Sequence, residues 1–295
     1  MIKKTSLFIF FTQIIFSFYA NAQTKTEIKQ YLISIIKLGG SVITNKEKKF
    51  GSTRYDTIIT ICKEISEFLS KHPHHRIIVV TGGGGLAHAI AKEYDLKTKL
   101  DSENMDDIWK CHDSVKELNS LIVEMLNLSG VPAFPIHPSS CTVCCNKKIK
   151  TMDIDIISQL LDNNVVPVLH GDIVLDTKQC MCILSGDQIV AYLGTTLCVD
   201  RIGLASIEDG ILDETGTVIP EINQKNFDLV KKHIGGSSCK SDVTGGMLKK
   251  VEELLGAQKP KLSCIFNGAK KGCVTQFLMG EPIGTTIVNT VSTYS

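Results

Sequence analysis

Two glycine-rich segments in the first third of the chain combine a flexible backbone with a nearby cation. The first, Lys37-Leu38-Gly39-Gly40-Ser41, ends an apolar run, and Lys46 follows five residues later. The second runs from Thr81 through four consecutive glycines to His88. Glycines allow backbone amides to approach an anion, and a lysine or histidine beside them neutralises its charge. Each segment alone also fits a simple packing turn, but together they predict a site for phosphate groups.

Three later segments repeat this chemistry. Residues 242–250 read D-V-T-G-G-M-L-K-K, so that Lys250 stands one helical turn after Gly246. Gly171-Asp172 follows an apolar run, at the point where α/β sheets present ligand contacts. Asp187 lies in Ser185-Gly186-Asp187-Gln188, which opens a helical pattern. Asp172 is as consistent with a simple turn residue as with a ligand contact. Asp187 is consistent with a helix cap or with a partner for a lysine.

Apolar periodicity indicates the elements that position these segments. Short β-branched runs alternate with stretches of helical spacing, and this alternation predicts an α/β fold with a mainly parallel, buried sheet. The expected strands are 33–38, 76–80, 131–136, 165–169, 202–206, 265–266 and 283–288, with a hairpin over 172–182. The expected helices are 57–70, 86–94, 115–128, 154–161, 188–194 and 247–255.

Composition excludes several classes of protein. The 295 residues carry 32 lysines and arginines against 31 aspartates and glutamates, a net charge of +1 that gives no footprint for nucleic acid. A hydrophobic content of 43% provides a core and excludes a disordered chain. The eleven cysteines are too few for a disulfide scaffold and lack paired metal-ligand spacing, so we expect no protein-bound metal. Trp109, the single tryptophan, is expected in the core rather than in a ligand pocket.

Residues 1–22 are typical of a secretory signal peptide, with Lys3 and Lys4 before an apolar run and Ala20-Asn21-Ala22 at its end. No stretch of the sequence is long and apolar enough to predict a stable membrane span. The signal-like segment conflicts with chemistry that depends on phosphates and free thiols, which belongs in the cytoplasm. We give the chemistry more weight and expect a cytoplasmic protein.

Common nucleotide-binding signatures are missing from the sequence. It contains neither a Walker A loop nor the H-R-D and D-F-G motifs of protein kinases. Gly82-x-Gly84-x-x-Ala87 formally fits a dinucleotide fingerprint, with Asp101 at a suitable distance. That oxidoreductase interpretation ranks last, because it leaves the lysine-bearing segments unexplained.

The order of the motifs resembles the amino acid kinase superfamily. The blocks are K-x-G-G-S-x-x-T-x-K, G-G-G-x-x-x-H, G-D, S-G-D, D-V-T-G-G-M-x-x-K and a late I-G-T, from about Ile33 to Val288. Within the superfamily the chain most resembles isopentenyl phosphate kinases, because His88 ends the glycine block. The resemblance implies a three-layer αβα sandwich with a mainly parallel central sheet.

The resemblance also assigns roles to the residues. It implies that ATP and its phosphates contact Lys37, Gly39, Gly40, Ser41, Gly83, Asp209, Gly246 and Lys250. The acceptor would be bound by Gly82, His88, Gly171 and Asp172. The catalytic set would be Lys46, His88, Lys37 and Asp187, with Lys46 stabilising the transferring phosphoryl group and Asp187 orienting the lysines. Mg²⁺ would accompany ATP.

The same resemblance implies one continuous kinase domain with two lobes, after the signal-like residues 1–22. Residues 31–180 would bind the acceptor, residues 181–295 would bind the nucleotide, and the protein would form a homodimer. Some positions differ from the usual kinase pattern: Thr81, Gly85, Leu86 and Ala87 replace residues of the glycine block, and Ile207 replaces an acid. These changes leave open a kinase for another phosphorylated, phosphonate or carboxylate compound, or a catalytically silent secreted ligand-binding protein of this fold.

Overall fold

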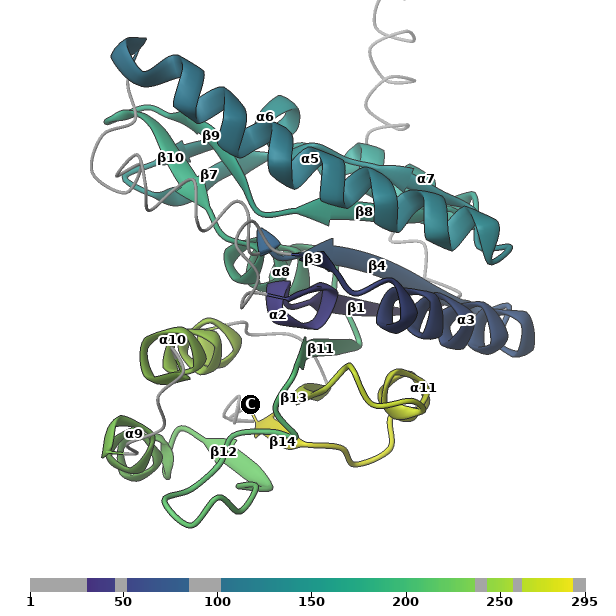
Figure 1. Ribbon diagram of the computed structural model, residues 1–295, viewed down its shortest axis with the longest axis vertical. Coiled ribbons are helices and arrows are strands. Elements are labelled where there is room, and N and C mark those ends of the chain that lie inside the picture. The colour runs from purple at the N-terminus through teal and green to yellow at the C-terminus, as the bar shows by residue number, and fades with distance from the viewer. Residues whose placement is uncertain (1–30, 46–51, 85–101, 237–242, 257–261, 289–295) are drawn as a thin grey trace, which may run out of the picture. The chain divides into compact units, whose positions relative to one another are not determined.

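The computed structural model describes residues 31–45, 52–84, 102–236, 243–256 and 262–288. The chain forms two compact units, Met1–Tyr31 and Leu32–Ser295. All the elements named below belong to the second unit, and most of them are labelled in Figure 1.

A sheet of eight strands forms the centre of this unit, in the order β12-β14-β13-β11-β1-β4-β8-β5. All neighbouring strands are parallel except β13 and β14, which are antiparallel, so the predicted mainly parallel sheet is confirmed. The strands are β1 (Leu32–Leu38), β4 (His75–Thr81), β5 (Ala133–Pro135), β8 (Val166–His170), β11 (Arg201–Ser206), β12 (Glu221–Asn223), β13 (Leu262–Asn267) and β14 (Thr285–Val288).

The strand register brings the predicted phosphate-binding turns together. Leu38 at the end of β1 pairs with Thr81 at the end of β4, and Thr81 pairs with His170 at the end of β8. On its other side Leu38 pairs with Ala205 in β11. Because parallel strands end at the same edge of a sheet, the turns that follow them become neighbours.

Helices cover both faces of the large sheet. On one face α3, α5 and α11 pack against apolar side chains of β1, β4 and β8 and form the main core. On the opposite face α8 packs against β1 and β4, and α10 packs against α8. This arrangement confirms the expected αβα layering, because strand residues alternate between the two faces. The helices are α2 (Gly40–Ile43), α3 (Tyr55–Lys71), α5 (Met105–Leu128), α6 (Pro138–Cys141), α7 (Asp155–Asp162), α8 (Gly186–Thr196), α9 (Phe227–Gly236), α10 (Val243–Gly256) and α11 (Cys273–Met279), with a 3₁₀ turn η1 (Ser102–Asn104).

A second sheet has four strands in the order β10-β9-β6-β7, and β9 lies between an antiparallel and a parallel neighbour. A two-stranded sheet pairs β2 with β3. The strands are β2 (Thr44–Asn45), β3 (Ser52–Thr53), β6 (Thr142–Cys145), β7 (Lys148–Met152), β9 (Asp172–Asp176) and β10 (Cys180–Leu184).

One helix differs clearly from the sequence expectation. Helix α5 begins at Met105, ten residues before the predicted start at Val115. Its first turns bury Ile108 and Cys111 against Ile173. The prediction that Trp109 fills the core is wrong, because 52% of its surface is exposed. No helix in the described part of the chain is long and apolar enough to cross a membrane.

Candidate active site

Three turns meet at the carboxyl edge of the large sheet. The amide of Gly82 donates to the carbonyl of Leu38 at 2.9 Å, and the amide of Gly171 donates to that of Thr81 at 3.1 Å. These bonds continue the sheet ladder past the ends of the strands and hold the turns after β1, β4 and β8 side by side. The glycines that sequence reasoning selected therefore belong to one cluster.

The turns are packed too closely for side chains. A Cβ atom on Gly82 would lie 2.8 Å from the amide nitrogen of Gly40, and one on Gly40 would lie 2.9 Å from that of Gly84. A Cβ on Gly39 would lie 2.7 Å from the carbonyl oxygen of Ala205. Contacts this short would force the backbones apart. The three turns, which follow β1, β4 and β8 and are called the mouth below, are therefore formed by backbone rather than by side chains. Ser41 lies in the first turn of α2, and Gly83 lies beside Gly84.

Lys37 supplies the positive charge at this mouth. Its side chain lies on the α8 face of the sheet, is 8% exposed, and its Nζ is 2.5 Å from Oδ1 of Asp187. A buried ammonium group needs such a partner, since desolvating an unpaired charge costs several kcal/mol. Gly186 makes room for the pair, because a Cβ there would lie 3.1 Å from Cε of Lys37. The structure thus brings two of the four predicted catalytic residues into contact.

The start of α8 fixes the position of Asp187. Ser185 accepts a hydrogen bond from the amide of Gln188, and the Gln188 side chain accepts one from the amide of Ser185. This capping box satisfies two amides that the first helical turn leaves free. Gln188 also donates from Nε2 to the carbonyl of Lys147, which lies between β6 and β7, at 2.9 Å. Asp187 is therefore not needed as a cap, and its carboxylate is available to Lys37.

Asp172 is buried, and its carboxylate already has several partners. It accepts from Nδ1 of His112 at 2.7 Å, from the amide of Ser139 at 2.9 Å and from the amide of Ile173 at 2.8 Å. Burial acts to raise the pKa of Asp172, but the His112 hydrogen bond, the charges of the nearby histidines and the Ser139 amide hold it below the usual value. The Asp172 side chain is thus an anchor for its neighbours, while its backbone forms the turn with Gly171.

Two more histidines lie beside this carboxylate. His170 has Nδ1 at 3.0 Å from the carbonyl oxygen of Gly171, so Nδ1 carries the proton. Its Nε2 then accepts from Nδ1 of His137 at 2.9 Å. Burial lowers the pKa of both rings, which favours their neutral forms. His112 and His137 were not selected from the sequence, because they are 58 and 33 residues from His170 along the chain.

On the other side of the mouth, Asp209 follows β11. Its carboxylate accepts hydrogen bonds from Nζ of Lys270 at 2.7 Å and from Nδ2 of Asn267 at 2.9 Å. These two bonds lower the pKa of Asp209. Lys270 is a cation that sequence reasoning missed, and its proximity to Asp209 depends on the pairing of β11 with β13.

The remaining predicted residues stand as follows. Gly246 and Lys250 belong to α10, which packs against α8. Their role at the phosphates stays a prediction. Lys46 and His88 lie outside the described residues, and their roles also stay predictions.

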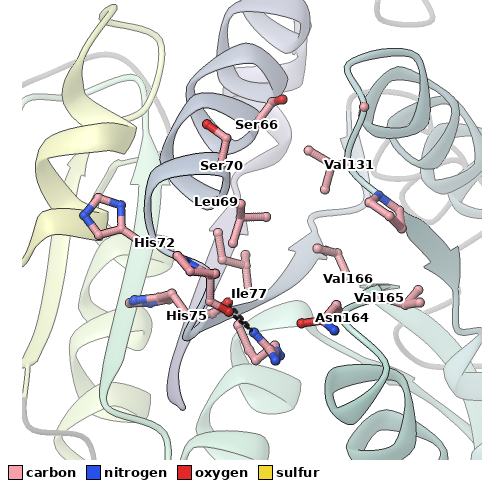
Figure 2. A pocket seen from close by; sticks show the side chains of 14 residues that line it. Ser66, Leu69, Ser70, His72, His75, Ile77, Val131, Asn164, Val165 and Val166 are labelled. Atoms are coloured by element: carbon pink, nitrogen blue, oxygen red, sulfur yellow. Dashed lines mark hydrogen bonds between the residues drawn. The ribbon is translucent and has the colours of Figure 1, made fainter.

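A cavity of about 310 Å³ lies at the opposite edge of the sheet. Figure 2 shows side chains from the end of α3 and the starts of β4 and β8, among them Leu69, His75, Ile77 and Val166. Nε2 of His75 is 2.8 Å from Oγ of Ser34, which gives this buried ring a partner. Because the cavity is at the amino ends of β4 and β8, it is separate from the Lys37–Asp187 pair.

Comparison with known proteins agrees with this geometry. The profile of the amino acid kinase family matches residues 33–265. The isopentenyl phosphate kinase of Methanocaldococcus jannaschii is 35% identical over 265 residues, which cover 87% of this chain and 98% of that protein. The enzyme of the same name from Haloferax volcanii is 34% identical over 86% of this chain and 97% of its own length.

A solved structure of isopentenyl phosphate kinase superimposes with a TM-score of 0.72 at 28% identity, covering 87% of this chain and all of that one. The acetylglutamate kinase of Pelagibacter ubique is 24% identical over 90% of this chain and 93% of that protein. The chain therefore belongs to the amino acid kinase family and is a small-molecule kinase that is similar to isopentenyl phosphate kinases over most of its length.

Proposed function

We propose that this protein transfers the γ-phosphoryl group of ATP to isopentenyl phosphate and releases isopentenyl diphosphate and ADP. The observation that carries the proposal is the buried Lys37–Asp187 pair beside three glycine turns at one sheet edge. Phosphoryl transfer requires mainly positioning and charge neutralisation, and such an arrangement supplies both. The choice of acceptor is supported by relatives that are 34% and 35% identical and carry that name.

The mouth fits the phosphates of ATP. Its turns are built from glycine backbone without side chains, and Gly40 and Ser41 begin a helix whose first amides have no partner within the helix. ATP would supply the phosphoryl group, and Mg²⁺ would enter bound to its phosphate oxygens. Among the described residues no group of three or more His, Cys, Asp or Glu is placed to hold a metal ion, so we assign no protein ligands to Mg²⁺.

In the proposed reaction an oxygen of the acceptor's phosphate attacks the γ-phosphorus, and the bond from that phosphorus to the bridging oxygen of ADP breaks. Lys37, oriented by Asp187, would neutralise charge on the oxygens around the transferred group. We assign the same task to Lys46 and assign His88 to the acceptor's phosphate. We assign nucleotide contacts to Gly39, Gly40, Ser41, Gly83, Asp209, Gly246 and Lys250, and acceptor contacts to Gly82, Gly171 and Asp172.

The strand order supports the proposed division into lobes. Strands β1, β4, β8 and β5 come from residues 31–180, and β11, β13, β14 and β12 come from residues 181–295, so each half of the sheet belongs to one lobe. We propose that the first lobe binds the acceptor and the second the nucleotide. We also propose a homodimer, which sedimentation would test, and a cytoplasmic location, which export of a fluorescent fusion to residues 1–30 would refute.

The decisive experiment assays the purified protein with ATP, Mg²⁺ and a panel of acceptors. The panel contains isopentenyl phosphate, other phosphate monoesters, a phosphonate and N-acetylglutamate. We expect isopentenyl phosphate to give the highest kcat/KM. Preference for a carboxylate would assign the protein to the acetylglutamate kinase type of chemistry, and binding without turnover would indicate a silent ligand-binding protein. The Asp187→Asn variant serves as a comparison with an expected lower turnover.

A further inference from the structure

The imidazole of His112 has no task in the proposed mechanism, yet it is attached to the site by a buried carboxylate. Its Nδ1 lies 2.7 Å from Oδ1 of Asp172, whose side chain is fully buried, while the His112 side chain is 20% exposed. Asp172 directly follows Gly171, and a Cβ on Gly171 would lie 3.1 Å from the amide nitrogen of Gly186. A short chain of contacts thus joins His112 to the mouth that holds Lys37.

His112 is the member of the three-histidine group whose pKa is raised above the usual value. In their neutral forms, His137 donates from Nδ1 to Nε2 of His170, and His170 donates from Nδ1 to the carbonyl of Gly171. By contrast, the hydrogen bond and negative charge of Asp172 raise the pKa of His112. The other charged groups around the ring are Asp113 and Lys116, both on α5, and they form an ion pair of 2.6 Å with each other.

The bond to Asp172 also fixes which part of the ring is available. With Nδ1–H donated to the carboxylate, the remaining donor is Nε2–H on the distal edge of the ring. An imidazolium held in this way is a charge-assisted donor suited to an oxygen of a phosphate dianion. We propose that His112 is a second cationic anchor for the acceptor's phosphate, held in position by Asp172. This inference rests on the proposed function and adds a specificity residue to it.

Two substitutions separate this role from a purely structural one. In His112→Asn, the amide nitrogen replaces Nδ1 and keeps the bond to Asp172 but removes the distal donor. In His112→Gln, the amide nitrogen replaces the distal Nε2 and gives up the bond to Asp172. Charge-assisted hydrogen bonds are strong enough that losing one weakens binding by about tenfold or more. We therefore expect His112→Asn to raise the KM for isopentenyl phosphate at least tenfold, His112→Gln to raise it less, and neither to change the KM for ATP by more than about twofold.

The measurements are acceptor kinetics and calorimetric binding of isopentenyl phosphate to the full chain. If the wild type binds this ligand without turning it over, the proposed function fails, and the inference is then decided by whether His112→Asn weakens binding. If the wild type does not bind it, or if His112→Asn binds it as well as His112→Gln does, the inference is overturned.

A pH profile gives an independent measurement. The kcat/KM for the acceptor should fall on the alkaline side as His112 loses its proton, and this limb should be missing in both variants. Ionisation of the acceptor's phosphate is common to all three proteins and cancels in the comparison. An alkaline limb that persists in both variants would contradict the assignment.

Discussion

At the scale of single residues, the proposed site depends on the buried ion pair between Lys37 and Asp187. The side chains of Lys37 and Asp187 are 8% and 15% exposed, so the pair is largely shielded from solvent. The aspartate does not cap its own helix, because Ser185 and Gln188 do so. Its side chain therefore serves the lysine, and its loss should affect chemistry as well as stability.

We expect Asp187→Asn to lower kcat by at least about tenfold, equivalent to about 1.4 kcal/mol of transition-state stabilisation. Removing one partner of a buried pair leaves the Lys37 ammonium without its counter-charge and without a fixed position. Steady-state kinetics checks this, with thermal unfolding to confirm that the variant folds. Asp155→Asn is the matched control, because Asp155 is an exposed aspartate in the first turn of α7. Equal kcat values for the two variants would refute the role of Asp187.

His88 and Lys46 should separate binding from chemistry. We expect His88→Ala to lower kcat/KM for the acceptor by at least about tenfold while ATP affinity stays nearly unchanged, since it removes one hydrogen bond to the acceptor's phosphate. We expect Lys46→Ala to lower kcat instead, because its charge is needed most during transfer. Initial rates at varied acceptor and varied ATP distinguish the two. Unchanged acceptor kinetics in His88→Ala would remove the main reason for assigning a phosphate acceptor.

At the scale of elements, one helix is held by a carboxylate from a distant part of the chain. Oε1 of Glu64 on α3 accepts from the amide of Gly272 at 2.6 Å, and Oε2 accepts from the amide of Thr275 at 2.9 Å. These are the first amides of α11, whose N-cap residue Gly272 has a left-handed conformation and no side chain to cap it. Glu64 thus caps a helix more than 200 residues away and ties the two halves of the chain together.

Glu64→Gln should lower the free energy of unfolding by about 1.5–3 kcal/mol, because a neutral amide replaces a charged acceptor of two amides and a hydroxyl. Urea unfolding monitored by circular dichroism measures the change. The control is Glu67→Gln, one turn along α3, where the side chain is exposed. If both variants unfold at the same urea concentration, the capping interaction contributes nothing to stability.

The sequence predicted elements best where the apolar pattern was long and regular. Strands β1, β4 and β8 and helix α3 have a continuous apolar face, and their bounds were close to those expected. The start of α5 was missed because its first ten residues bury only Ile108 and Cys111, which is too few to show a helical period. The hairpin β6–β7 was missed because its strands are short, and because the place of β6 in the sheet depends on contact with β9.

The site was predictable where its residues adjoin the ends of strands. The glycine turns and Asp187 can be recognised from a few consecutive residues. The His112–Asp172 pair cannot, because it joins residues 60 positions apart. No short sequence pattern indicates which histidine pairs with a buried carboxylate, since the packing of α5 on β9 brings His112 to Asp172. The same reason explains why Lys270 was not connected to Asp209.

At the scale of the whole molecule, the two proposed lobes share one sheet. Strand β1 of the first pairs with β11 of the second over five residue pairs, from Ser34 and Arg201 to Leu38 and Ala205. Phe266 and Phe277 from the second half belong to the same core cluster as Ile36 and Val79 from the first. Neither half has a complete core without the other, so the lobes should not unfold separately.

Unfolding should therefore be a single cooperative transition. Trp109, the only tryptophan, lies in the first lobe, so its fluorescence reports on that half, whereas far-ultraviolet circular dichroism reports on all helices and strands. We expect the two signals to give the same midpoint in urea. A fluorescence midpoint that differs from the dichroism midpoint would show that the halves unfold independently.

The glycine turns have a consequence for engineering this enzyme. A Cβ atom added at Gly39, Gly40 or Gly82 would lie within 3 Å of neighbouring backbone. We therefore expect most variants at these three positions to be inactive. New acceptor preferences therefore have to come from side chains outside these three glycine positions. A library restricted to such positions should yield altered specificity at far higher frequency than random mutagenesis of the whole gene.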